Sequence, residues 1–143
     1  MTWMPWLCRA RNEPRHLAVG RWGEARAEAF LREAGFRIRG RRVRVGRRDE
    51  FDLIAQDGVQ LVFVEVKTRR GEAFGRPVRA VDRAKRVRMS RAALRYLRRL
   101  PDPRICFRFD IIEVVGCPED PPDQVAIRHI ANAFPLDRRY MLP

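Results

Sequence analysis

EFDLIAQDGVQLVFVEVKT, residues 50–68, is the stretch of this 143-residue chain from which the fold can be inferred. Two apolar runs flank Asp57-Gly58, and an Asp-Gly pair between such runs is the strongest short-range signal for a β-hairpin. A two-residue turn at these positions pairs Gln56 with Val59. The stretch is therefore predicted to form two antiparallel strands joined by that turn.

The register of this hairpin determines which side chains share a face, because side chains alternate between faces with period two. Counting back from the turn, Asp52 lies opposite Phe63. Two residues further, Glu50 lies opposite Glu65. One face therefore carries Glu50, Asp52, Glu65 and Lys67, with Asp52 and Glu65 as diagonal neighbours whose Cα atoms are roughly 7–8 Å apart. The opposite face is expected to pack against a helix and carries Phe51, Leu53, Val62, Val64 and Val66.

Three carboxylates on one strand pair repel one another, because like charges directly opposite destabilise a sheet. A hard divalent cation offsets this repulsion, and Mg²⁺ needs only one or two carboxylates because it keeps several waters. Lys67 follows Glu65 by two residues and is expected to lean toward the same spot. There it can orient an attacking water and balance charge on a phosphate. The set is thus suited to metal-assisted hydrolysis of a phosphodiester bond.

The alternative interpretation is a solvated hairpin face, because charged residues on one side of a hairpin are more often exposed to water. A one-residue slip in the turn would also divide the four residues between two faces. Two observations favour a site. Glu65 interrupts the apolar run LVFVEV, as expected in a buried central strand, and a strongly basic chain has little need of clustered acids unless they bind something.

The balance of charge indicates the partner. Lys and Arg total 31 against 18 Asp and Glu, which gives a formal net charge of +13. Such a surface attracts polyanions. Nucleic acid is favoured over an anionic membrane surface, because a membrane-surface protein would present a helix with a large apolar face. No apolar run approaches the roughly 18 residues of a membrane span.

Lysine is rare in this chain. Only Lys67 and Lys85 are lysines, and all other basic side chains except histidine are arginines. A GC-rich coding sequence would account for this. So would a requirement for a compact charge at these two positions, because the planar guanidinium of Arg does not replace Lys at a tight site.

The length predicts a single domain. Residues 18–134 are expected to form it, with 1–17 as a poorly ordered extension and 135–143 as a C-terminal tail. The predicted class is α/β, with a central mixed sheet flanked by helices in the order α-β-β-β-α-β-β. The helices are expected at 18–34 and 78–100, and the strands besides the hairpin at 36–45, 105–115 and 125–130.

The three cysteines, Cys8, Cys106 and Cys117, lack CxxC spacing and support neither a zinc site nor a disulfide framework. The N-terminal residues show no signal-peptide pattern. A cytoplasmic protein is therefore expected.

Several segments together resemble one family. EFDLIAQDGVQLVFVEVKTR, residues 50–69, resembles the GEIDLIA…LVFVEVKTR signature of the YraN family, small uncharacterised bacterial proteins with a restriction-endonuclease-like fold. The resemblance covers about residues 18–134. It extends to GRWGEARAEAFLREAGF at 20–36, FGRPVRAVDRAKRVR at 74–88, RFDIIEV at 108–114 and IRHIANAF at 127–134.

The resemblance implies a PD-(D/E)-x-K nuclease core, similar to that of archaeal Holliday-junction resolvases, with Mg²⁺ or Mn²⁺ as cofactor. Asp52 matches the first acid of that motif, and Glu65 and Lys67 match its E-x-K. Glu24 matches an additional helix acid of the resolvase-like branch and so joins Asp52 and Glu65 as a candidate catalytic residue and metal ligand. The chain departs from the family at Asp49, which stands where the family has Gly.

The favoured function is a metal-dependent endonuclease acting on DNA, with branched or damaged DNA as candidate substrates. The rival is a non-catalytic nucleic-acid-binding protein that uses the same basic surface on DNA or structured RNA. A third alternative, a protein–protein adaptor, explains the fold but not the charge. Resolvases act as symmetric dimers, which makes a homodimer a further expectation. The residues expected to bind phosphates are Arg41, Arg42, Arg44, Lys85 and Arg88, although an ordinary exposed basic face would also account for the last two.

Overall fold

The computed structural model describes residues 13–71 and 81–141, and the element order expected from the sequence is confirmed. Most of the predicted N-terminal extension, residues 1–12, lies outside this part of the chain. None of the described helices is long and apolar enough to cross a membrane. The elements are α1 (Arg15–Glu33), β1 (Arg37–Val45), β2 (Asp49–Asp57), β3 (Gln60–Arg69), α2 (Arg83–Leu97), β4 (Phe107–Val115) and β5 (Ala126–Phe134), with two short 3₁₀ turns, η3 (Pro122–Gln124) and η4 (Arg138–Tyr140).

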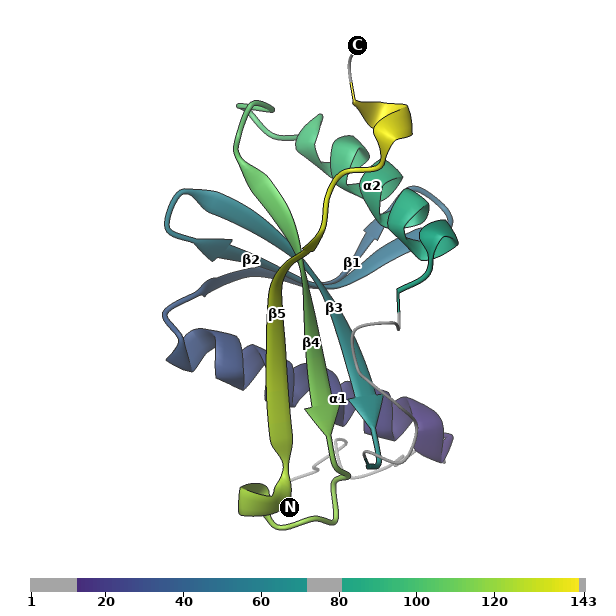
Figure 1. The fold of residues 1–143 in the computed structure, drawn as a ribbon, viewed down its shortest axis with the longest axis vertical. Coiled ribbons are helices and arrows are strands. Elements are labelled where there is room, and N and C mark those ends of the chain that lie inside the picture. Colours follow the sequence, from purple (N-terminus) through teal and green to yellow (C-terminus); the bar gives the residue numbers. More distant parts are fainter. Residues whose placement is uncertain (1–12, 72–80, 142–143) are drawn as a thin grey trace, which may run out of the picture.

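The five strands form one mixed sheet in the order β1-β2-β3-β4-β5. Neighbouring strands are antiparallel except β3 and β4, which run parallel. A parallel pair requires a crossover connection, and the chain between these two strands contains α2. Figure 1 shows the strong twist of the sheet, with α1 crossing the lower part of the strands and α2 lying beside their upper part. This arrangement is consistent with the nuclease-like fold that the resemblance implies.

Each helix covers one face of the sheet. On one face, Ala27 and Leu31 of α1 are fully buried in a core shared with β2, β3 and β4. On the other face, Met89 and Ala93 of α2 are buried in a second core that also contains Phe134 of β5. Because β3 is covered on both faces, its sequence is nearly continuously apolar.

The hairpin turn lies one residue later than predicted. Gly58 and Val59 form the turn, and Gln56 pairs with Leu61, so the predicted pairing of Gln56 with Val59 is wrong. Gly58 has a φ of 58°, and glycine at the first central position suits a II′ turn. The prediction placed Asp57 there instead. The register is thereby displaced by two residues, and a two-residue displacement keeps each side chain on its face.

The predicted apolar face of the hairpin is divided between the two cores. Phe51 packs on the α2 side together with Ile54, whereas Leu53 packs on the α1 side. The alternation breaks at Asp52. In the neighbouring strand, Arg42 lies between the partners of Leu53 and Phe51 and has a left-handed φ of 47°. This local irregularity explains why strict period-two counting fails here.

Several element boundaries also differ from the prediction. α1 begins at Arg15 rather than at residue 18, so residues 15–17 belong to the helix and not to the predicted extension. α2 begins at Arg83 rather than near residue 78, because the side chain of Asp82 caps it and accepts a backbone N–H of the first turn at 2.8 Å. β5 is longer than predicted and ends at Phe134. The chain that follows is attached to α2, since the backbone N–H of Asp137 donates to Ser90 Oγ at 2.9 Å.

Candidate functional site

The two strands of the hairpin diverge where the sequence placed the acidic residues. β2 and β3 pair only as far as Leu53 and Val64, and beyond this point β3 is paired with β4. At the fork, Oδ2 of Asp52 accepts a hydrogen bond from the backbone N–H of Val66 at 2.7 Å. The side chain of Asp52 thus takes the place of the missing strand pairing and is held beside β3.

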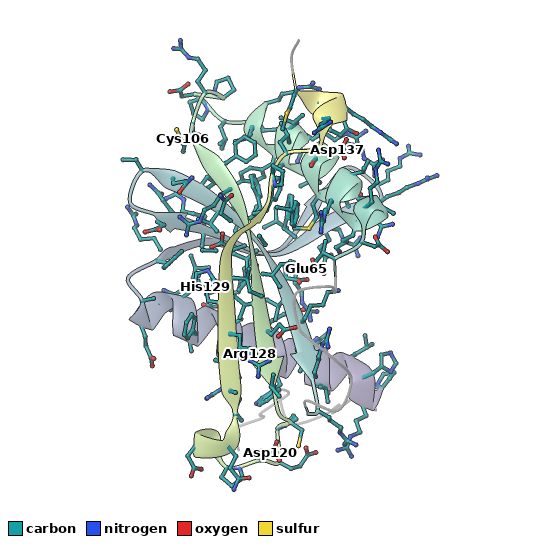
Figure 2. The ribbon with its side chains drawn as sticks, in the orientation of Figure 1. Glu65, Cys106, Asp120, Arg128, His129 and Asp137 are labelled. Carbon is teal, nitrogen blue, oxygen red and sulfur yellow. The ribbon has the colours of Figure 1, made fainter. Side chains whose placement is uncertain are left out.

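Glu65 is held by the only two lysines of the chain. It is 5% exposed and lies on the α2 side of β3. Lys67 Nζ is 3.1 Å from its Oε1, and Lys85 Nζ, on the first turn of α2, is 3.2 Å from its Oε2. A buried carboxylate needs such compensation, because an unpaired buried charge is very costly. The structure therefore brings together Glu65, Lys67 and Lys85, and Figure 2 shows Glu65 at the centre of the sheet.

The surroundings of Asp52 oppose its ionisation. The pKa of Asp52 is raised from 3.8 to about 7, chiefly by burial and next by the negative charge of Glu65. Glu24 adds a smaller effect in the same direction, whereas the Val66 N–H and the charge of Lys85 lower the pKa. The negative charge of Glu65 thus opposes the ionisation of Asp52, and a positive charge beside Asp52 would favour its ionised form.

Glu24 reaches the site because α1 approaches β3 very closely. Gly23 is buried, and a Cβ at this position would overlap the side chain of Thr68. The absence of a side chain at Gly23 thus sets the distance between α1 and the strand that carries Glu65 and Lys67. The carboxylate of Glu24 is itself paired with Arg42, whose Nε lies 2.8 Å from Oε2.

Replacing Gly23 by Ala is therefore expected to destabilise the protein by about 1–3 kcal/mol, because the extra methyl group forces α1 away from β3. Gly20 provides a matched control one turn earlier, since a Cβ there meets nothing within 4 Å. Gly20→Ala should stabilise α1 by about 0.5–1 kcal/mol through helix propensity. Urea unfolding of both variants measures the difference, and equal effects of the two substitutions would contradict the close approach.

A cleft of about 670 Å³ lies between the first half of α1 and the end of β3. It is large enough for a ligand of drug or nucleotide size. Two of the predicted catalytic residues line it. The lining consists of Arg15, His16, Val19, Gly20, Glu24, Val66, Lys67, Thr68 and Arg70.

The three arginines of β1 that were predicted to bind phosphates are paired with acids in the structure. Arg41 donates two hydrogen bonds to Glu28 of α1, Arg42 pairs with Glu24, and Arg44 lies 3.4 Å from Glu50 of β2. Their phosphate-binding role stays a prediction, and it requires these ion pairs to open or to share their donors with a phosphate.

Lys85 and Arg88, the two residues of α2 that were predicted to bind phosphates, have different surroundings. Lys85 contacts Glu65 and thus belongs to the acidic centre rather than to an exposed face. Arg88 is exposed and lines a small hollow that Lys85 and Glu50 also border. Glu50 is exposed as well, so it does not join the pair of buried acids.

Asp52 and Glu65 fit a divalent cation by their chemistry. Carboxylate oxygens are the donors that Mg²⁺ and Mn²⁺ prefer, and Mg²⁺ is commonly held by one or two carboxylates plus waters. Because the charge of Glu65 raises the pKa of Asp52, a cation beside Asp52 would favour its ionised form. Within residues 13–71 and 81–141, however, no group of three or more Asp, Glu, His or Cys side chains is arranged to hold a metal. Binding of Mg²⁺ or Mn²⁺ by Asp52, Glu65 and Glu24 thus stays a prediction.

Asp49, the position where the chain departs from the family pattern, has a structural role. It is 7% exposed, and its two carboxylate oxygens accept hydrogen bonds from Arg91 of α2 at 2.9 and 3.1 Å. This bidentate pair ties the start of β2 to the helix that carries Lys85. Sequence reasoning did not identify this contact.

Two buried acids of β4, Asp110 and Glu113, were also missed. Asp110 is fully buried and is surrounded by Arg108, His129 Nε2 and the backbone N–H of Asn132. Glu113 is fully buried as well. Both interrupt the apolar run FRFDIIEVV, which is the same signal that singled out Glu65 and could have identified them.

Comparison with known proteins supplies a family. A family model described as "Uncharacterised protein family UPF0102" matches residues 23–114, which contain all four predicted catalytic residues. A UPF0102 protein of Symbiobacterium thermophilum is 52% identical over 117 residues, covering 81% of this chain and 95% of that protein. UPF0102 proteins of Nocardia farcinica and Syntrophotalea carbinolica are 44% and 41% identical, covering 82% and 85% of this chain and 89% and 94% of their own lengths.

Proposed function

The chain belongs to the UPF0102 (YraN) family, and on the basis of its site we propose that it is a metal-dependent endonuclease that hydrolyses phosphodiester bonds in DNA. The observation that carries this proposal is the environment of Glu65. The only two lysines of a chain with +13 net charge converge on this one buried carboxylate, which lies beside a second carboxylate with a pKa of about 7.

In this proposal Asp52 and Glu65 hold Mg²⁺ or Mn²⁺. When bound, such an ion supplies Lewis acidity toward the phosphoryl oxygens and lowers the pKa of water. Asp52 is kept in place for this by the N–H of Val66. Lys67, with about a third of its side chain exposed, can donate hydrogen bonds to the attacking water and to a non-bridging phosphate oxygen. Lys85 holds the second oxygen of Glu65 and so fixes the orientation of that carboxylate.

Two features of the surface support nucleic acid as the substrate. The net charge of +13 attracts a polyanion from a distance. The cleft beside Lys67 is bordered by Arg15 and Arg70, which are suited to phosphate groups. A strand bound along the cleft would pass next to Lys67.

Binding to DNA is expected to weaken steeply with salt. If the surface neutralises about four to six phosphates, a fourfold rise in salt should lower the affinity by about 10²–10³, because condensed counterions are released on binding. The measurement is fluorescence anisotropy of a labelled duplex at several salt concentrations, without divalent ions. An affinity that does not respond to a fourfold change in salt would argue against a phosphate-binding surface.

The second candidate function is a non-catalytic nucleic-acid-binding protein. One observation favours it: in the described residues both oxygens of Glu65 are already compensated by lysines, so the acid is stable without a metal. The same basic surface would then serve DNA or structured RNA.

A cleavage assay separates the two functions. The purified full chain is incubated with junction, flap, single-stranded and duplex DNA, each with Mg²⁺ and with Mn²⁺. The endonuclease predicts metal-dependent products from at least one substrate, whereas the binding protein predicts complexes without products.

A further inference from the structure

A second hollow, of about 450 Å³, lies between α2 and the chain that follows β5. None of the residues predicted to bind phosphates lines it. The lining, which we call the α2–η4 groove, consists of Arg83, Arg86, Pro135, Leu136, Asp137, Arg138 and Arg139. Four arginines and one aspartate give this groove a net charge of +3.

Hydrogen bonds hold the two walls of the groove together. The backbone N–H of Asp137 donates to Ser90 Oγ of α2 at 2.9 Å, and the carboxylate of Asp137 accepts the backbone N–H of Arg139 in η4 at 3.0 Å. Figure 2 shows Asp137 next to α2, at the start of η4. The segment after β5 is therefore attached to the helix at a defined position, and the groove is a built feature of the fold.

Arg86 is oriented in the groove by two uncharged groups. Its Nε donates a hydrogen bond to the carbonyl oxygen of Val81 at 3.2 Å, and its guanidinium lies over the ring of Phe134, 5.7 Å from the centre. A cation is attracted to the face of an aromatic ring. Neither contact neutralises the charge, and the terminal nitrogens of Arg86 have no acceptor in the described part of the chain. The guanidinium is thus held in place before a ligand binds, which lowers the entropic cost of binding.

The other three arginines of the groove are exposed. Arg139 lies 4.0 Å from Asp137, which offsets part of the charge. Arg83 and Arg138 form no ion pair with any residue that the structure describes. The nearby carboxylate of Asp82 caps the backbone of α2 instead. The groove therefore presents guanidinium groups whose charge is not neutralised, and such groups bind phosphate oxygens.

A nucleic-acid backbone is the occupant that these features favour. The net charge of +13 attracts a polyanion, and the groove lacks the large apolar face of a membrane-surface helix. The groove is also close to the candidate site, because Lys85, the residue before Arg86, contacts Glu65. A helix with its side chains is about 10–12 Å across, which corresponds to about three to four base pairs at roughly 3.4 Å each.

We propose that the α2–η4 groove binds backbone phosphates about three to four nucleotides from the phosphate that is cleaved. Arg86 is the pre-oriented contact, and Arg83 and Arg138 are the exposed ones. This inference rests on the proposed function, because it takes nucleic acid as the ligand. The shared chemistry is the backbone phosphodiester, and separate DNA and RNA probes distinguish its source.

The test measures binding without cleavage. Labelled DNA and RNA probes, single-stranded and duplex, are titrated in EDTA at several salt concentrations. The variant Arg86→Gln/Arg138→Gln should lower the affinity for at least one probe about 10–50-fold and reduce the slope of log affinity against log salt by about two. The matched control, Arg99→Gln/Arg104→Gln, removes the same charge from exposed side chains between α2 and β4. It should lower the affinity less than about threefold, through the general field alone.

A second variant keeps the test decisive if the first one unfolds because Arg86 no longer packs on Phe134. Arg83→Gln/Arg138→Gln removes two charges from the groove, and neither side chain has a hydrogen bond or ion pair to lose among the described residues. This variant should fold and also reduce the salt slope by about two. A slope equal to that of the control would overturn the proposal.

An acidic protein segment is the other polyanion that such a groove could take, and a labelled oligoglutamate peptide tests it. If the groove variants lose affinity for this peptide but bind every nucleic-acid probe as the control does, the groove binds acidic protein and the proposal is wrong.

The outcomes separate this inference from the proposed function. If the parent binds nucleic acid and the groove variants lose no more affinity than the control, the groove proposal is wrong, while the endonuclease proposal stands. If the groove variants show the expected loss but the parent cleaves nothing with any metal, the groove proposal stands and the endonuclease proposal fails. A parent that binds none of the nucleic-acid probes overturns both.

Discussion

Replacing Lys67 by Arg is expected to lower the rate of DNA cleavage by about 10²–10⁴, the range typical of a lost catalytic group or electrostatic stabiliser. The positive charge is kept, but the guanidinium is wider and forked and cannot occupy the position of a compact ammonium 3.1 Å from Glu65. Binding should remain within about twofold of the parent, since the 31 basic residues still supply the field. The measurement compares cleavage rate and affinity on the same substrate.

Two further variants sharpen this result. Lys67→Ala should lose cleavage to a similar degree, with a slightly larger loss of binding. Arg104→Lys, at a side chain that is 92% exposed before β4, makes the reverse exchange away from the site and should leave the cleavage rate unchanged. If Lys67→Arg cleaves at the parental rate, the catalytic assignment of Lys67 is wrong. Lys67 would then only contact a phosphate, and Arg can replace Lys at such a contact without loss.

Replacing Asp52 by Asn is expected to stabilise the metal-free protein above neutral pH. The folded protein holds the proton of Asp52 more tightly than the unfolded chain does, because its pKa is about 7 rather than 3.8. The parent therefore loses stability as pH rises from about 4 to 7 and stays at the lower level above 7. Asn does not ionise and keeps an oxygen for the N–H of Val66. The variant should match the parent near pH 4 and exceed it at pH 8 by about 1–3 kcal/mol, below the upper bound of about 4 kcal/mol that the shift allows.

The same pair of proteins tests the metal site. Millimolar Mg²⁺ or Mn²⁺ should raise the melting temperature of the parent at pH 8, because an ion that binds only the folded state stabilises it by mass action. Asp52→Asn should not respond. Thermal unfolding with and without the ions gives both values. If millimolar divalent ions leave the melting temperature of the parent unchanged, a metal site at Asp52 and Glu65 is contradicted.

Local sequence signals were sufficient for the element order but not for the register of the hairpin. Asp57-Gly58 and Gly58-Val59 are both acceptable two-residue turns, and only the pairing of the strands decides between them. The structure uses the second, with Gly58 at the position that requires a positive φ. The resulting shift of two residues left Glu65 and Lys67 on the predicted face of the sheet, so the prediction that these two residues share a site was not affected. The break in alternation at Asp52 lies opposite the irregularity at Arg42 of β1, and no periodicity in the sequence predicts it.

The contacts of the site depended on tertiary packing. Lys85 was predicted to face a phosphate, yet the placement of α2 turns it toward Glu65. Arg41 and Arg42 lie on a strand in which apolar residues alternate with arginines. Neighbouring residues in the sequence do not indicate that both side chains bind acids of α1. The use of lysine did contain a signal, because Lys67 and Lys85, the only two lysines, both form ion pairs with the carboxylate of Glu65. That convergence could be seen only after folding.

A metal-dependent endonuclease site at Asp52 and Glu65 is tested by product formation from the preferred DNA substrate, with the parent and Asp52→Asn compared side by side. Each protein is assayed with Mg²⁺, with Mn²⁺ and with EDTA, at a salt concentration where both bind the DNA. We expect products from the parent only when a divalent ion is present, and none above background from Asp52→Asn under any condition. Equal product from the two proteins, or complexes of the parent with DNA that yield no product with either ion, would contradict it.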